Sequence, residues 1–89
     1  MILAIVLQGK PPFEQDQVVD LYAYEGGSPA LDELHNREPY TTMKGVITRP
    51  YDLPLVRIFG GYERWFLPFE INKSGEFMLA AIYDKGGPQ

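Results

Sequence analysis

The residue types that carry most acid–base and nucleophilic chemistry are scarce in this sequence. The chain has no cysteine and one histidine, His35. A Ser–His pair would have to combine His35 with Ser28 or Ser74, and both serines stand in positions expected to be caps or turns. A structural zinc site needs several Cys or His ligands. We therefore expect no catalytic residue, no metal and no cofactor. His35 is expected at the C-terminal end of a short helix, where a cationic side chain interacts favourably with the helix dipole. This structural role explains the residue without catalysis.

The carboxylates do not single out a catalytic pair either. Asp32 and Glu33 are adjacent, and neighbours on a helix point about 100° apart, so they do not converge on one site. The pairs Gly26-Gly27 and Gly60-Gly61 are typical of turns rather than of phosphate-binding loops.

The segment around Gly60-Gly61 is the strongest candidate for a binding site. A two-residue turn there would place Arg57 opposite Arg64 on paired strands, and two opposed cations repel each other. An acidic segment of the same chain, a bound anion or an acidic partner would then have to compensate. Arginines interleaved with aromatic residues are also typical of surfaces that bind single-stranded nucleic acid. A register shift of one residue would remove the Arg–Arg pair.

Aromatic residues are abundant, and one core of this size cannot hide all of them. The chain has six tyrosines and one tryptophan among 89 residues. Tyr and Trp are favoured at interfaces because one end is apolar and the other forms hydrogen bonds. Homodimerisation would bury the excess, and we expect a homo-oligomer.

Two short segments resemble the opening of SH3 domains. Asp20-Leu21-Tyr22-Ala23-Tyr24-Glu25 is followed by Asp32-Glu33-Leu34, although Ala23 stands where that family has Asp. The resemblance implies binding of proline-rich peptides through Tyr22, Tyr24 and Trp65. It does not extend to the rest of the chain, and we assign no family.

Charge is unevenly distributed along the chain. The net charge is −4, which argues against general nucleic-acid binding. Acids predominate from Phe13 to Tyr40, and bases predominate from Thr41 to Leu67. The absence of cysteine favours a reducing, cytoplasmic compartment. The apolar run Met1–Gln8 lacks the flanks of a signal peptide and has far fewer than the roughly 20 residues that span a bilayer, so we expect a buried strand.

The pattern along the chain predicts a mainly β domain over 1–84 with a C-terminal tail at 85–89. Six strands are expected: five at 2–7, 17–25, 41–48, 55–59 and 76–84, and one from Tyr62 that bends near Pro68 or lies on an edge. The strand over 41–48 would bulge at Gly45. One helix would begin with Ser28 as N-cap and Pro29 next, and it would be short or 3₁₀. Together these elements predict a small antiparallel sheet, curled or partly closed into a barrel.

These observations favour a non-enzymatic protein–protein interaction domain that acts through a β-surface. Compact acidic domains of this kind are common among bacterial and phage accessory proteins, including inhibitors. The alternative is binding of an anion or single-stranded nucleic acid through Arg57 and Arg64, and a small-ligand or enzymatic domain is a third class. The predicted partner-binding residues are Arg57, Tyr62, Arg64, Trp65, Tyr22 and Tyr24.

Overall fold

The apolar N-terminal run forms the strand around which the sheet is built. In the computed structural model, which describes residues 1–58 and 61–84, this run is β1 (Ile2–Gln8). It lies in the interior of the sheet, between β2 and β7. Its odd-numbered side chains are buried on one face and Ala4 and Val6 on the other. A strand with both faces covered has no polar alternation, which is why the run is continuously apolar.

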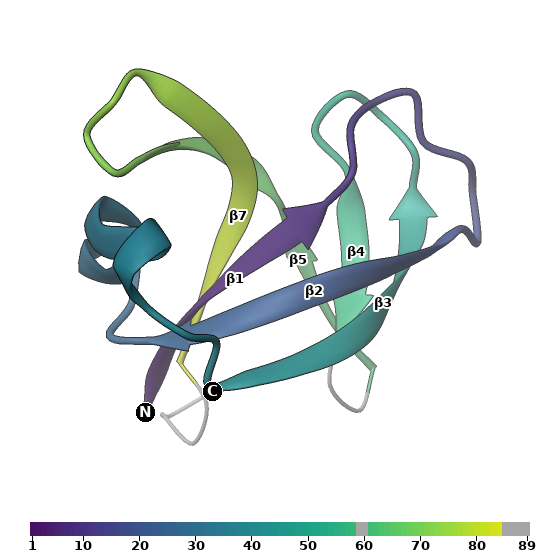
Figure 1. The fold of residues 1–89 in the computed structure, drawn as a ribbon. Coiled ribbons are helices and arrows are strands. Elements are labelled where there is room, and N and C mark those ends of the chain that lie inside the picture. Colours follow the sequence, from purple (N-terminus) through teal and green to yellow (C-terminus); the bar gives the residue numbers. More distant parts are fainter. Residues whose placement is uncertain (59–60, 85–89) are drawn as a thin grey trace.

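Within the described residues, seven antiparallel strands form one sheet with the order β5-β4-β3-β2-β1-β7-β6, accompanied by one short helix. The sheet curls strongly (Figure 1). The remaining elements are β2 (Val18–Glu25), η1 (Ser28–Asn36), β3 (Thr41–Arg49), β4 (Leu55–Ile58), β5 (Tyr62–Trp65), β6 (Leu67–Ile71) and β7 (Glu76–Asp84). The predicted curled, mainly β fold with one short helix is confirmed. The predicted tail and residues 59–60 lie outside the described residues.

The two edge strands of the sheet are consecutive in the chain and are separated by Phe66 alone. β5 pairs with β4 at one end of the sheet, and β6 pairs with β7 at the other. The Phe66 side chain is fully buried, and its backbone N–H donates to the Pro54 carbonyl at 3.0 Å. The predicted single strand is therefore two, divided at Phe66 rather than at Pro68. Pro68 lies in an edge strand as expected, where a missing N–H is tolerated.

Curling gives the sheet two separate apolar clusters. The inner cluster fills the curl with side chains from β1, β2, β3, β4 and β7, together with Phe66. The helix cluster lies on the outer face, where Leu31 and Leu34 of η1 cover Ala4, Val6 and neighbouring side chains. In Figure 1, η1 lies outside the curled sheet. Asn72 ties η1 to the β6–β7 turn, because its N–H donates to the Leu31 carbonyl at 2.8 Å and its Oδ1 accepts from the His35 N–H at 3.1 Å.

The helix begins differently from the sequence expectation. Gly27, with a φ of 68°, occupies the N-cap position, and no side chain caps the helix. Ser28 is already its first residue, so the predicted Ser28 cap is wrong. The reason is that Gly27 adopts a backbone conformation that other residues rarely take. The helix is 3₁₀ and is interrupted by non-helical angles at Glu33, which confirms the 3₁₀ alternative.

Gly45 does not mark a bulge, contrary to the prediction. The β2–β3 ladder runs through the pair Val19 and Gly45 without a shift, whereas the β3–β4 register shifts between Ile47 and Arg49. Gly45 is required by close packing instead. A Cβ at this position would lie 2.7 Å from Leu21 Cδ1 and 2.8 Å from Val56 Cγ1.

Gly45→Ala should therefore lower the free energy of unfolding by about 1–3 kcal/mol, because both contacting methyl groups are buried and must move. Urea denaturation measures this loss. Thr42→Ser, at an exposed position of the same strand, should stay within about 0.5 kcal/mol of wild type. Unchanged stability of Gly45→Ala would show that the core accepts the extra methyl group.

Candidate functional site

The β4–β5 hairpin has a different register from the one predicted. Arg57 pairs with Glu63, Ile58 with Tyr62 and Val56 with Arg64. The predicted pair of opposed arginines is therefore wrong, and a carboxylate faces Arg57. The last printed pair of this ladder is Ile58 with Tyr62, and Gly60 of the predicted turn lies outside the described residues. Because side chains alternate along a strand, a shift of one residue moves Arg57 and Arg64 onto opposite faces.

Arg64 and Tyr62 contact β7 across the open side of the curl. The Arg64 guanidinium carbon lies 5.0 Å from the centroid of the Tyr83 ring and 5.9 Å from that of Tyr62. The two tyrosine rings are 5.8 Å apart between centroids. Arg64 Nη1 also donates to the Glu63 carbonyl at 2.8 Å. These contacts connect the edge strand β5 to β7, which gives Arg64 a structural role.

Arg64→Gln should lower the free energy of unfolding by about 1 kcal/mol, because the cation–π contacts with the two tyrosine rings are lost. Arg57→Gln is the matched control at an exposed position of the same hairpin and should change stability by less than about 0.5 kcal/mol. Thermal and urea denaturation of both variants compare the two positions. Equal effects of the two substitutions would contradict the role assigned to Arg64.

Trp65 points outward and stacks on Tyr51. The ring centroids are 6.5 Å apart and the planes differ by 14°. Trp65 remains 49% exposed and Tyr51 60% exposed. Leu55, the cross-strand partner of Trp65, extends this apolar surface on the same side of the hairpin. We refer to Tyr51, Leu55 and Trp65 as the outer aromatic face.

Charged and polar groups border the outer aromatic face. Arg57 and Glu63 lie on the same side of the hairpin as Leu55 and Trp65, two residues along each strand. Thr48 Oγ1 donates to Glu63 Oε2 at 2.6 Å, which ties this carboxylate to β3. An exposed aromatic centre with a polar border resembles the anatomy of protein–protein interfaces.

Tyr22 and Tyr24 lie elsewhere, on the side of β2 that faces the helix cluster. Tyr24 is buried in that cluster, and Tyr22 is partly buried against it. Burial, followed by the neighbouring Tyr22, raises the pKa of the Tyr24 hydroxyl above its ordinary value. The six predicted partner-binding residues therefore do not form one surface. The peptide binding implied by the SH3 resemblance would need Tyr24 exposed, and in this structure it is buried.

The raised pKa of Tyr24 predicts a loss of stability in alkali. Above pH 10 the unfolded chain releases the Tyr24 proton while the folded chain keeps it, so the unfolded state gains and the free energy of unfolding falls as pH rises toward the folded pKa. Tyr24→Phe removes this contribution, and its stability should fall less between pH 10 and pH 11 than that of the wild type. Urea denaturation at pH 8, 10 and 11 measures the difference, and parallel pH profiles would contradict the assignment.

The acidic segment Phe13–Tyr40 pairs with bases other than Arg57 and Arg64. Asp20 forms an ion pair with Lys44, its cross-strand partner, and the hydrogen bond and charge of Asp20 raise the pKa of Lys44. Glu33 Oε2 lies 3.0 Å from Arg37 Nη2. The Glu33–Arg37 pair is local, whereas Asp20 and Lys44 join the acidic segment to the base-rich segment, and neither pair includes Arg57 or Arg64. His35 Nε2 lies 4.0 Å from Glu76 Oε1, and both side chains are exposed.

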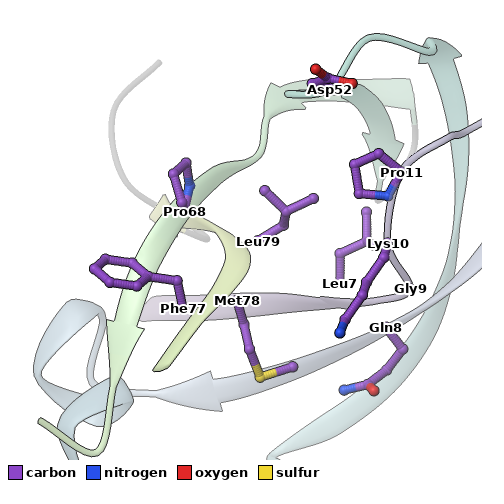
Figure 2. A pocket seen from close by; sticks show the side chains of 10 residues that line it. All are labelled: Leu7, Gln8, Gly9, Lys10, Pro11, Asp52, Pro68, Phe77, Met78 and Leu79. Atoms are coloured by element: carbon purple, nitrogen blue, oxygen red, sulfur yellow. The ribbon is translucent and has the colours of Figure 1, made fainter. Parts of the chain in front are cut away.

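A groove of about 720 Å³ opens between the end of β1 and the first half of β7. Figure 2 shows Leu7 and Leu79 in its centre, Pro68 and Phe77 on one side, and Pro11 on the other. The lining residues are Leu7, Gln8, Gly9, Lys10, Pro11, Asp52, Pro68, Phe77, Met78 and Leu79. Sequence reasoning missed this site, because its walls come from four segments that are distant in sequence. The one local signal was the break at Gly9-Lys10-Pro11-Pro12 after an apolar strand.

Residues 1–58 and 61–84 contain no cluster of three or more His, Cys, Asp or Glu side chains suited to a metal ion. No helix in the same ranges has the length and apolar character needed to cross a membrane. Comparison of the chain with known protein families, curated proteins and solved structures found no match.

Proposed function

We propose that this protein is a non-enzymatic interaction domain that binds other protein surfaces, a second copy of itself included, through the outer aromatic face. The observation that carries the proposal is the stacked pair of Tyr51 and Trp65, each about half exposed. Complete burial of a large apolar side chain contributes about 1.5–3 kcal/mol of favourable free energy. Because each ring is about half exposed, a partner that covers both rings would gain roughly half of that amount from each. Stacking fixes the orientation of both rings in advance, which reduces the entropy lost on binding.

The charges beside the aromatic face favour pairing of two copies. Arg57 and Glu63 lie next to each other on one side of the hairpin. A two-fold axis through the aromatic face brings Arg57 of one copy toward Glu63 of the other, and the reverse contact forms by symmetry. The surface is therefore complementary to itself in charge as well as in apolar character.

The alternative of anion or nucleic-acid binding has lost its geometric support. It rested on Arg57 and Arg64 facing each other, and the register separates them onto opposite faces. Arg64 is also engaged with Tyr62 and Tyr83. The accessory-protein class and the cytoplasmic location remain predictions from the sequence.

Trp65→Ala should weaken self-association by about 10- to 100-fold, because a central aromatic side chain of an interface contributes on the order of 2 kcal/mol. Sedimentation equilibrium over a concentration series measures the effect. Tyr40→Ala is the matched control: Tyr40 is as exposed as Trp65, at 49%, but lies outside the aromatic face. A wild-type chain that stays monomeric at millimolar concentration would contradict self-pairing.

Charge exchange tests the two-fold arrangement separately. Arg57→Glu and Glu63→Arg should each weaken the dimer, whereas the double variant should recover most of its affinity. Urea denaturation of the same variants shows whether folding is affected. Immobilised wild-type and Tyr40→Ala chains that capture a host protein which Trp65→Ala does not would identify a different partner on the same face.

A further inference from the structure

The groove beside β1 is bordered by strand edges rather than by the face of a sheet. Successive side chains of a strand point to opposite faces, so a pocket on one face is lined by every second residue. This groove is lined by the consecutive residues 77–79 of β7 and 7–11 at the end of β1. Figure 2 shows Leu7 and Leu79 on one side of the strand edges and Gln8 and Met78 on the other.

The hydrogen-bonding ladders leave part of one side of β7 unpaired, although β7 is not an edge strand of the sheet. β7 pairs with β1 only from Ala80 to Asp84, and the last pair is Val6 with Ala80. From Glu76 to Ala80 the partner of β7 is β6. On the side toward β1, the segment Glu76–Leu79 therefore has no neighbouring strand among the described elements. Phe77, Met78 and Leu79 of this segment line the groove, and no ladder toward β1 pairs their backbone groups, whereas the Glu76 N–H donates to Ser74 Oγ at 3.4 Å.

The outer edges of the sheet are less open to strand addition. β6 carries Pro68, which has no N–H, and η1 packs beside this strand. At the other end, Tyr62 and Arg64 of β5 contact Tyr83. The edge at Glu76–Leu79 differs because an apolar groove adjoins it.

We propose that this groove binds an extended peptide, which adds to Glu76–Leu79 as a further β-strand. The ladder that stops at Ala80 supplies free backbone donors and acceptors, and β-strand addition is the binding mode that uses them. Leu7 and Leu79 form an apolar floor on one side, which selects an aliphatic or aromatic side chain at alternate positions of the peptide. Lys10 and Asp52 carry opposite charges at the rim, so the groove suits an uncharged backbone.

Titration with short synthetic peptides tests the proposal. Three blocked five-residue peptides, in which Val, Ile or Phe alternates with Thr, are added to ¹⁵N-labelled full-length protein. At least one should give saturable chemical-shift changes at residues 7–10 and 76–79, and should slow hydrogen exchange of amides in 77–79. No binding by any of the three, or shifts confined to other regions, would overturn the proposal.

Backbone methylation separates strand addition from simple apolar binding. Two versions of the bound peptide carry N-methyl groups either at the even or at the odd positions. One set should lower the affinity at least about tenfold, because up to two hydrogen bonds from the peptide N–H groups to carbonyls of β7 are lost. If neither set lowers the affinity, the groove is a pocket for apolar small molecules and the peptide proposal fails.

Two protein variants complete the test. Phe77→Ala removes a rim residue that is 60% exposed and should weaken peptide binding several-fold without unfolding the chain. Ile82→Ala, on the same strand but outside the groove, should leave peptide binding unchanged. Trp65→Ala should also bind the peptide normally. The proposal that the aromatic face mediates association and the proposal that the groove binds a peptide can therefore fail independently. Full affinity of Phe77→Ala would contradict the placement of the peptide.

Discussion

The fold depends on one geometric constraint, which is that a single stretch of chain forms both edges of the sheet. β5 and β6 lie at opposite ends of the strand order, yet only Phe66 separates them in sequence. A flat sheet of this order would hold its edges several strand spacings apart, each about 4.8 Å. The sheet must therefore curl until its edges meet at Phe66, whose side chain then fills the interior it helps to enclose.

Both candidate surfaces follow from this curl. Since Phe66 points inward, its neighbour Trp65 must point outward, where Tyr51 is the ring available to stack on it. Closure at β6 also obliges β7 to pair with β6 along its first half and with β1 along its second half, changing partner at Ala80. Two strands that diverge from a shared point leave a wedge between them. The groove is that wedge, so it is a product of the same closure that buries Phe66.

Local patterns in the sequence predicted the elements, but not the contacts that depend on register. The continuous apolar run of β1 and the short helix η1 could be identified because their signals lie within a few residues. The pairing of Arg57 could not, because two glycines permit a turn without fixing its length, and one extra residue reverses every side chain. The packing role of Gly45 was equally hidden, since Leu21 and Val56 approach it from other strands. The groove depends on four separate segments and has no local signature.

An open strand edge and an exposed tryptophan can both cause unwanted association of a small β protein. The residues around each of them determine which kind of partner can bind there. A long flat edge invites pairing with any other sheet, and proteins usually cover or blunt it. The edge at Phe77–Leu79 is short and faces Leu7 and Pro11 across the groove, which favours a single extended chain over a folded sheet. The outer aromatic face differs from this edge, because its two rings are about half exposed and Arg57 and Glu63 border it. We therefore propose a folded partner for the aromatic face and an unfolded segment for the groove.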